Sequence, residues 1–370
     1  MNGGRFLRKV MVRFAWAPAI AVVASAGVLA GTAADAPRWK DPLDTPAVSS
    51  ALASTTQLLS VAVAGKRMVA VGWRGHILVS DDGGAHWKQV PSPVSADLTS
   101  VSFVSPELGW AVGHGGVVLH TQDGGLTWRV QTDGRATAKT MVAYYEKLLA
   151  AGSGEAEKLL ADVKLNTKTG ADQPWLDVQF LDPSHGYVTG SFGMFMGTAD
   201  GGKSWTPLQD KIDNPNGLHL TGIARTEGDV YIASEQGTVF HKGPASDRFT
   251  ALQTGYAGTF FGIAARQDVI IVYGLRGTAY RSDDRGRTWA PLRTGVSTGI
   301  TGGQILDDGS VLLVTQGGDL LAAPPAGTSF SRQKTVKSYL FADIAPAQDG
   351  RAAIVGTAGV FVQPLGRPAR

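Results

Sequence analysis

One sixteen-residue motif recurs along most of this chain, and the repeat restricts the possible folds more than any other feature. Four copies are regular and three are weaker. The second glycine of a G-x-x-G turn marks each copy, at Gly75, Gly116, Gly193, Gly237, Gly277, Gly318 and Gly359. The steps between these glycines are 41, 77, 44, 40, 41 and 41 residues. A period near 41 residues is the length of one four-stranded propeller blade.

Each unit contains four short apolar stretches separated by turn residues, which is the pattern of four short strands. The sequence therefore predicts an all-β fold, a single seven-bladed β-propeller over residues 35–370. The blades are expected near residues 58–91, 97–132, 175–208, 219–252, 258–293, 299–332 and 338–366. The last unit ends after its third strand. We expect an N-terminal strand near Trp39 and Lys40 to close this blade, because a fourth strand would cover an exposed sheet edge.

The single step that is too long contains residues 133–172, which read as a helical insertion between blades 2 and 3. Apolar residues recur there at helical spacing, at Met141, Tyr144, Tyr145, Leu148 and Leu149, then at Leu159, Leu160 and Val163. Because the insertion follows the outer strand of blade 2, a short helical hairpin capping part of the channel mouth is expected. It either packs on the rim or presents an apolar strip to a partner helix.

Residues 1–34 have the layout of a signal peptide. Basic residues precede an apolar stretch and a run of small residues, at Arg5, Arg8, Lys9 and Arg13. Cleavage near Ala34 or Ala36 is predicted, and a retained membrane-tethering helix is the alternative. Either way the protein is expected to be exported, periplasmic or otherwise extracytoplasmic, and soluble or peripheral to the membrane. Cleavage removes four basic and no acidic residues and moves the formal charge from +3 to −1, which argues against a nucleic-acid partner.

Four of the units carry the motif [ST]-x-D-x-G-x-x-W, known as the Asp-box. Its aspartate and hydroxyl side chains can bind local backbone groups, its glycine accepts a positive φ, and its tryptophan anchors the turn. We interpret these residues as structural fold markers in preference to catalytic or metal-binding groups. The four copies are Ser80, Asp82, Gly84 and Trp87; Thr121, Asp123, Gly125 and Trp128; Thr198, Asp200, Gly202 and Trp205; and Ser282, Asp284, Gly286 and Trp289.

The G-x-x-G turns join the second and third strands, so we expect them on the face opposite the Asp-boxes, near the channel mouth. Their tips vary while the glycines recur, and loops at one rim of a rigid scaffold commonly carry binding sites. The alternative is that the tips are solvated and bind nothing. The predicted binding residues are Arg74, His114, Glu235 and Arg276, with Trp73 and Phe192 as apolar anchors.

The sequence shows no sign of an active site. It has no cysteine, which excludes a disulfide framework and a thiol nucleophile. Its seven histidines lack metal-ligand spacing, and neither a G-x-S-x-G motif nor a phosphate-binding loop is present. We therefore predict no catalytic residue, no metal and no cofactor.

Two longer phrases accompany the repeat. L-x-x-V-x-F-x-x-P-x-x-G-W-A-V-G runs from Leu98 to Gly113, and W-L-D-V-Q-F-L-D-P-S-H-G-Y-V-T-G runs from Trp175 to Gly190. With the G-x-x-G and Asp-box units, they resemble the photosystem II stability/assembly factor family of plants and cyanobacteria and its bacterial relatives. The resemblance covers residues 37–366 apart from the insertion. It implies a non-enzymatic scaffold that binds a membrane-protein subunit or an assembly intermediate.

The sequence departs from that family in three ways. The family uses an arginine-rich patch, whereas only Arg74 and Arg276 stand in a G-x-R-G turn here. The helical insertion and the bacterial type of signal also differ, so another envelope complex, such as a transporter, is an alternative partner.

A sialidase-like glycoside hydrolase and a non-catalytic glycan-binding propeller are the rival interpretations, because Asp-boxes occur in those proteins too. Such hydrolases need a cluster of three arginines, an acid/base aspartate and a Tyr–Glu pair. Glu235 has no evident carboxylate partner in the sequence.

Overall fold

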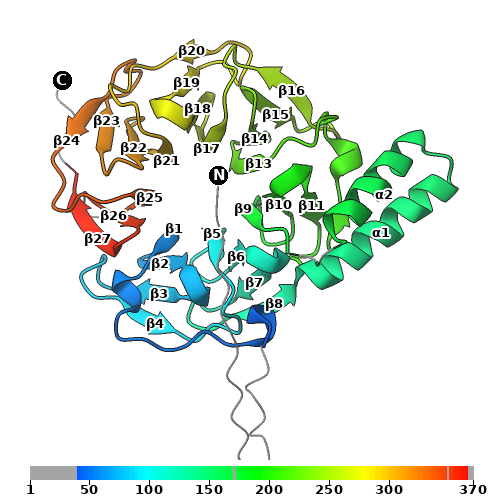
Figure 1. Ribbon diagram of the computed structural model, residues 1–370. Coiled ribbons are helices and arrows are strands. Elements are labelled where there is room, and N and C mark those ends of the chain that lie inside the picture. The colour runs from blue at the N-terminus through cyan, green and yellow to red at the C-terminus, as the bar shows by residue number, and fades with distance from the viewer. Residues whose placement is uncertain (1–39, 169, 171, 348–349, 366–370) are drawn as a thin grey trace, which may run out of the picture. The chain divides into compact units, whose positions relative to one another are not determined.

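The computed structural model describes residues 40–168, 170, 172–347 and 350–365. Seven antiparallel sheets stand side by side in a ring around a central channel (Figure 1). In each sheet the first strand in sequence lies innermost, and the following strands lie progressively outward (Figure 1). The prediction of a seven-bladed all-β propeller is therefore confirmed.

The first three sheets pair their strands in sequence order. The first contains β1 (Leu58–Ala64), β2 (Arg67–Gly72), β3 (Ile77–Ser80) and β4 (Lys88–Val90). The second contains β5 (Leu98–Phe103), β6 (Gly109–Gly113), β7 (Val118–Thr121) and β8 (Arg129–Thr132). The third contains β9 (Trp175–Phe180), β10 (Gly186–Gly190), β11 (Phe195–Thr198) and β12 (Thr206–Pro207).

The next three sheets repeat this order. The fourth contains β13 (Leu220–Arg225), β14 (Val230–Ser234), β15 (Thr238–Lys242) and β16 (Thr250–Gln253). The fifth contains β17 (Phe260–Arg266), β18 (Val269–Gly274), β19 (Ala279–Ser282) and β20 (Ala290–Pro291). The sixth contains β21 (Ile300–Ile305), β22 (Val311–Thr315), β23 (Leu320–Ala323) and β24 (Ser331–Gln333).

The seventh sheet has three strands in the described part of the chain, β25 (Phe341–Pro346), β26 (Arg351–Gly356) and β27 (Gly359–Pro364). Trp39, around which the fourth strand was expected, lies outside the described residues, so that strand stays a prediction. Lys40 belongs to no strand. The residues after it form two short 3-10 turns, η1 (Pro42–Asp44) and η2 (Ala53–Thr55). The second of these, η2, contacts β27 of the seventh sheet, where Gly359 leaves room for the Ser54 carbonyl.

The core consists of the apolar layers between neighbouring sheets. All residues of β6 and β22, and nearly all of β2, are buried, because a sheet inside the ring is covered on both faces. Such strands therefore read as continuous apolar runs. Between the second and third sheets, the rings of Trp110 and Phe180 stack with centroids 3.4 Å apart. Core burial stabilises the ring without disulfides.

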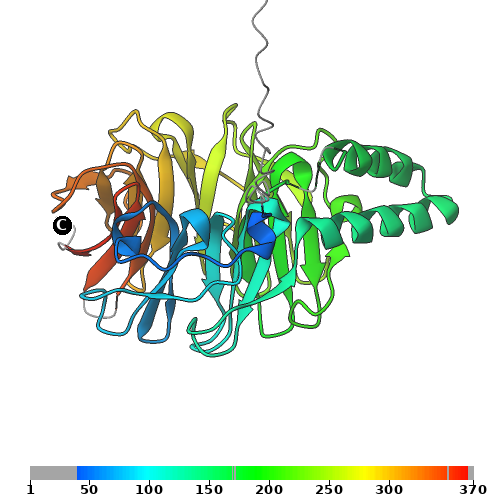
Figure 2. The same cartoon turned by 60° about the horizontal axis from the view of Figure 1, so that its bottom comes forward.

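The insertion forms two helices between blades 2 and 3, α1 (Gly134–Ala150) and α2 (Gly154–Asn166), as predicted. Met141, Tyr145, Leu160 and Val163 form the small core of this hairpin. The expectation that it caps the channel mouth is wrong: the helices project outward from the rim beside blade 3 (Figures 1 and 2). Packing of α1 on β12, and of α2 on η6 (Gln209–Lys211), directs them away from the channel. No helix among the described residues is long and apolar enough to cross a membrane.

Candidate functional site

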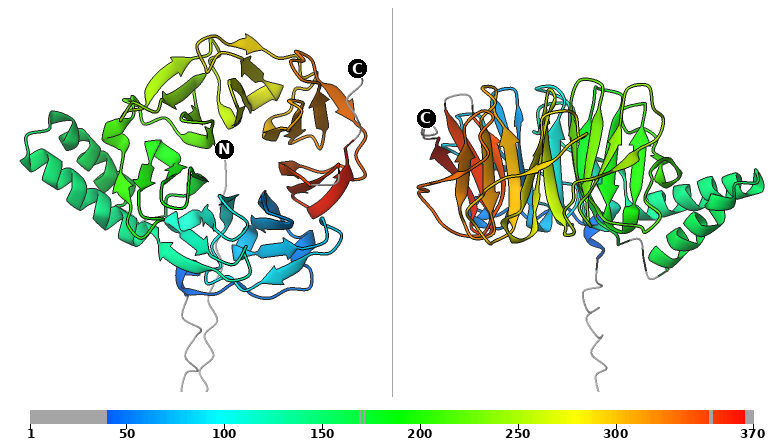
Figure 3. Two further views of the ribbon diagram at one scale, coloured as in Figure 1. Left: turned by 180° about the vertical axis from the view of Figure 1, so that it is seen from behind. Right: turned by 90° about the horizontal axis from the view of Figure 1, so that it is seen from above.

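The G-x-x-G turns, one per sheet, lie on one face of the ring, here called the G-x-x-G face. Each four-stranded sheet ends on the side where the next one begins, so the links between sheets run over this face too. The segment with the helical hairpin α1–α2 is the longest of these links. In the side view the hairpin lies toward one face of the ring (Figure 3). Four of the turns are 3-10 turns, namely η3 (Trp73–Gly75), η4 (His114–Gly116), η5 (Ser191–Gly193) and η7 (Leu275–Gly277).

The residue before the second glycine has a left-handed backbone in five of the seven turns. Its φ is 54° at Arg74 and Phe192, 55° at Gln236, 57° at Arg276 and 66° at Gly115. A residue with a Cβ is strained in this region by about 1 kcal/mol or more, whereas glycine is not. Four blades therefore keep a large side chain at a position where glycine is the less strained residue.

The second glycine of the turn recurs because the following link passes directly over it. A Cβ on Gly75 would lie 2.0 Å from the Val94 carbonyl oxygen, and one on Gly277 would lie 2.1 Å from that of Val296. Both distances are far below van der Waals contact. The glycines therefore hold the turn against the link and fix the direction in which the tip points.

The predicted binding residues reach solvent on this face, but they do not form one patch. Trp73 is 47% and Phe192 51% exposed, and the side chains of Arg74, His114 and Arg276 are exposed as well. The two arginines belong to the first and fifth sheets, which are not neighbours in the ring (Figure 1). No compact arginine cluster results from them.

Two of the predicted residues meet through a third that sequence reasoning missed. The rings of Phe192 and His219 lie 4.9 Å apart, and the His219 backbone N–H donates to a Glu235 carboxylate oxygen over 2.8 Å. Glu235 is half-buried and already engaged, so it is less free to bind a partner than its position in the sequence suggested. His219 directly precedes the inner strand β13, a position that belongs to no motif.

Two carboxylates that the sequence analysis did not single out line the channel, a space of about 630 Å³. Asp177 accepts hydrogen bonds from the Ser100 hydroxyl (2.6 Å), the Val178 N–H (2.8 Å) and the Ile223 N–H (2.7 Å). Ser100 and Ile223 belong to the sheets on either side of Asp177. Burial raises the pKa of Asp177 above its usual value. This aspartate therefore ties three consecutive blades together.

Asp343 makes the corresponding contacts where the first and seventh sheets meet. It accepts from the Ser60 hydroxyl (3.0 Å), the Val61 N–H (3.1 Å) and the Ile344 N–H (2.8 Å). Burial raises the pKa of Asp343 to about 6. A signal for both aspartates was present in the repeat. The third position of each inner strand is polar or glycine throughout, as Ser60, Ser100, Asp177, Gly222, Gly262, Gly302 and Asp343.

These aspartates do not resemble the carboxylate pair of a glycoside hydrolase. Such a pair needs one group free to protonate the leaving oxygen and another free to attack or activate water. Asp177 and Asp343 are both occupied by backbone N–H and serine donors. In the described part of the chain, no three His, Asp or Glu side chains gather closely enough to hold a metal ion. The hydrolase alternative is not favoured.

The Asp-boxes lie at the turns between third and fourth strands, on the opposite face. In each, the hydroxyl of the first residue accepts from the N–H of the glycine, over 2.9 Å for Ser80 and Gly84. The aspartate in turn binds the end of the turn. Hydrogen bonds from the Ser204 hydroxyl and N–H hold the pKa of Asp200 at about 2. The motif thus satisfies its own backbone groups, as expected of a structural marker.

Comparison with known proteins identifies the family. The model of the family described as "Photosynthesis system II assembly factor YCF48" matches residues 47–141 and 155–338. Photosystem II assembly protein Ycf48 of Synechococcus sp. (strain JA-3-3Ab) is 26% identical over 314 residues, covering 76% of this chain and 89% of the relative. A chloroplastic stability/assembly factor, HCF136 of Cyanidioschyzon merolae (strain NIES-3377 / 10D), is 51% identical over 47 residues, which is 12% of this chain and 11% of the relative.

Solved structures that are named YCF48 share the fold. YCF48 bound to D1 peptide has a TM-score of 0.60 at 18% identity, with 87% of this chain and 99% of that chain covered. YCF48 from Cyanidioschyzon merolae has a TM-score of 0.61 at 18% identity, with 84% and 96% covered. None of these relatives is named as part of a transporter, so the expectation of a transporter partner has no support. The chain belongs to the Ycf48 family of photosystem II assembly factors.

Proposed function

We propose that this protein is an exported, non-catalytic assembly scaffold that binds a peptide segment of a membrane-protein subunit on its G-x-x-G face. The observation that carries the proposal is the family match over residues 47–141 and 155–338. One family structure is described as bound to a D1 peptide, and another relative is named an assembly lipoprotein. By analogy, the partner is a subunit of a membrane complex or its assembly intermediate.

The geometry of the G-x-x-G face supports this proposal. Exposed side chains stand on turns held in place by close backbone packing, so little conformational freedom would be lost on binding. Arg74 and Arg276 face solvent from separated blades, which suits an extended peptide better than a compact anion. Four turns of this one face keep a large side chain on a left-handed backbone, which supports a use in binding because backbone strain clusters at functional sites.

The test is crosslinking in the native host followed by affinity purification of the tagged protein. We expect the wild type to recover a membrane-protein subunit, and the Arg74→Glu/Arg276→Glu variant to lose most of it. The matched control is Lys203→Glu/Arg287→Glu, which reverses two exposed charges in Asp-box loops on the opposite face. Equal recovery by both variants would reject the G-x-x-G face as the site. Recovery of glycans and of no protein by the wild type would reject the scaffold.

A further inference from the structure

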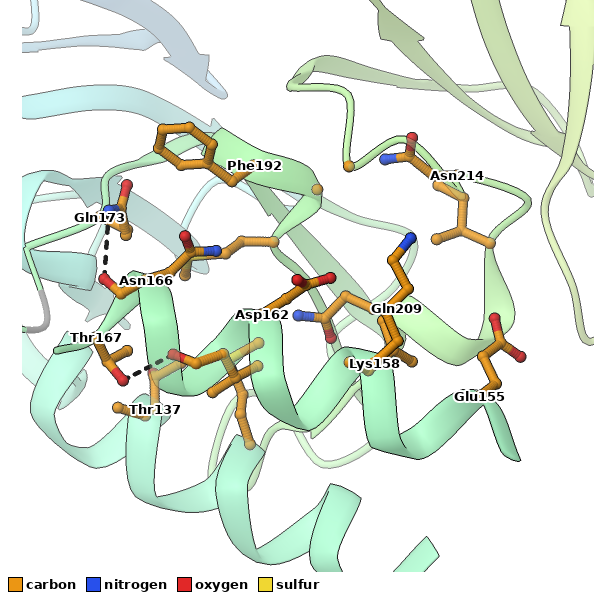
Figure 4. Close-up of a pocket in the computed structure, with 18 of the residues that line it drawn as sticks. Thr137, Glu155, Lys158, Asp162, Asn166, Thr167, Gln173, Phe192, Gln209 and Asn214 are labelled. Atoms are coloured by element: carbon orange, nitrogen blue, oxygen red, sulfur yellow. Dashed lines mark hydrogen bonds between the residues drawn. The ribbon is translucent and has the colours of Figure 1, made fainter. Parts of the chain in front are cut away.

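A cavity of about 260 Å³ lies between the helical hairpin and the third blade (Figure 4). It is larger than an engineered cavity of about 150 Å³ that binds benzene, so it has room for an aromatic side chain. Both helices, the tip of η5 and the segment after η6 contribute to its walls. The apolar lining residues are Met141, Leu159, Val163, Phe192, Met194 and Ile212.

The walls suit an aromatic group. Met141 is 2% and Met194 8% exposed, so two thioether side chains are buried at its edge. Methionine adapts its shape to a ligand and makes favourable contacts with aromatic rings. Phe192, half-exposed on a G-x-x-G tip, lies at the upper side of the cavity in Figure 4 and connects it with the G-x-x-G face.

One polar group in the wall lacks a partner. Thr137 is only 3% exposed, and its hydroxyl makes no hydrogen bond with any described residue. A buried hydroxyl without a partner is costly, and most buried polar groups in native proteins are paired. The oxygen is enclosed, so a ligand reaches it only after the Thr137 side chain turns to the second χ1 conformer that a helix allows threonine. A ligand that then brings an indole N–H or a phenol O–H beside the hydroxyl would remove that cost. The cavity therefore favours tryptophan or tyrosine over phenylalanine or leucine.

The rim is slightly acidic. Glu155 and Asp162 are exposed lining residues, and Lys158 is the basic residue among the lining side chains. The Lys158 ammonium group already donates to the Pro215 carbonyl oxygen. A basic residue next to the aromatic ring of a ligand would therefore lie near two carboxylates and one ammonium group that already donates a hydrogen bond. The net charge of this rim attracts it.

The hairpin is held in place before any ligand arrives. The Tyr145 hydroxyl donates to the Gln209 side chain over 2.6 Å, which joins α1 to the segment below the cavity. At the start of α1, Arg135 pairs with Asp44 at 2.8 Å and with Asp133 at 2.6 Å. Such a preformed site does not pay the cost of ordering its walls.

We propose that this cavity binds one tryptophan or tyrosine side chain of the partner peptide, adjacent to a lysine or arginine of that peptide. The proposal rests on the proposed function and adds a chemical selection rule to it. The hairpin would then determine which peptide is taken, while the G-x-x-G tips hold the rest of the segment.

The first measurement is a titration of the mature chain, labelled with ¹³C at its methionine methyl groups, with N-acetyl-tryptophanamide. We expect saturable shifts of the Met141 and Met194 signals, with a dissociation constant of about a millimolar or below. Met68, buried in the first sheet, is the internal control and should not move. Absence of saturable shifts, or equal shifts at all three methyl groups, would overturn the proposal.

Two variants test the selection rule. Thr137→Val keeps the shape and removes the hydroxyl, so the tryptophan and tyrosine amides should bind about threefold to tenfold more weakly. N-acetyl-phenylalaninamide has no side-chain donor and should bind both proteins equally. Ala138→Phe fills the cavity and should abolish binding of all three probes. If the dissociation constants of the tryptophan and phenylalanine probes have the same ratio in the wild type and in Thr137→Val, the role of Thr137 is contradicted.

The crosslinking experiment separates this proposal from the scaffold function. If the Ala138→Phe variant recovers the partner as well as the wild type does, the scaffold function stands and the proposed role of the cavity is overturned. A small molecule that copurifies with the protein in native mass spectrometry, and that Ala138→Phe removes, would show that the cavity serves a free ligand and would also overturn it.

Discussion

At the scale of single residues, the tips of the G-x-x-G turns are the most informative positions. Arg74 and Arg276 have a left-handed backbone, and the equivalent residue on the second blade is a glycine, Gly115. Their exposed side chains add little to the core, so folding alone does not explain why glycine is absent. Sequence reasoning found these residues from the spacing of the flanking glycines, but the strain became visible only in the structure.

The strain at these exposed tips predicts that the Arg74→Gly/Arg276→Gly variant loses binding while its stability stays nearly the same. Relief of the left-handed strain offsets the greater freedom of glycine in the unfolded chain, so the free energy of unfolding should change by less than about 1 kcal/mol. Recovery of the crosslinked partner should fall strongly.

Urea unfolding and the crosslinking yield measure the two effects. Gln267→Gly is the matched control, because Gln267 is exposed, has a φ of 53° and lies in the turn between β17 and β18 on the opposite face. It should leave the yield unchanged. Undiminished recovery by the double glycine variant would show that the strained side chains serve no partner.

At the scale of elements, each Asp-box is a turn that satisfies its own backbone. The Thr198 hydroxyl accepts from the Gly202 N–H over 2.9 Å and donates to Asp200 over 2.9 Å. Thr198 is buried, so water does not replace it easily. The motif could be interpreted from sequence because all its partners lie within a few residues. The direction of the helical hairpin could not, because it depends on contacts with β12 and η6.

Thr198→Val tests the structural role of the Asp-box. The variant leaves the Gly202 N–H buried without an acceptor, so the free energy of unfolding should fall by about 1 to 3 kcal/mol. Thr206→Val, at an exposed position of the neighbouring β12, should change it little. Urea unfolding of both variants measures this, and equal values for the two would argue against the hydroxyl as the organising group.

At the scale of the whole molecule, side chains at the inner strands link the blades around the channel. The Thr99, Thr221 and Thr301 hydroxyls donate to carbonyl oxygens of the next sheet, at 2.7 to 2.9 Å. Asp343 adds the link between the first and last sheets. Because no described strand from the start of the chain enters the seventh sheet, this junction depends on side-chain contacts and apolar packing.

The Asp343 link predicts a pH-dependent stability. A pKa of about 6 in the folded protein, against 3.8 for an ordinary aspartate, means that the folded state binds more protons between these values. The stabilising contribution of this group therefore grows as the pH falls from about 7 to about 4. Because Asp343 keeps some contact with channel water, we expect a change of about 1 to 2 kcal/mol.

The measurement is urea unfolding of the wild type and Asp343→Asn across this pH range. The difference between the two unfolding free energies cancels the titration of other groups, such as His76, whose pKa is lowered chiefly by burial. That difference should rise toward acidic pH. A flat curve for Asp343→Asn would contradict the raised pKa.

The sequence by itself determined the number of blades, the Asp-box turns and the place of the insertion, since period and turn chemistry depend on residues close together in the chain. Tertiary structure alone decided which distant residues meet. It separated Arg74 from Arg276, brought Phe192 to His219, placed Asp177 and Asp343 between blades, and opened the cavity beside Thr137. The physical reason is that these contacts depend on how the sheets and helices pack. A motif that is similar in every blade carries no information about contacts that differ from one blade to the next.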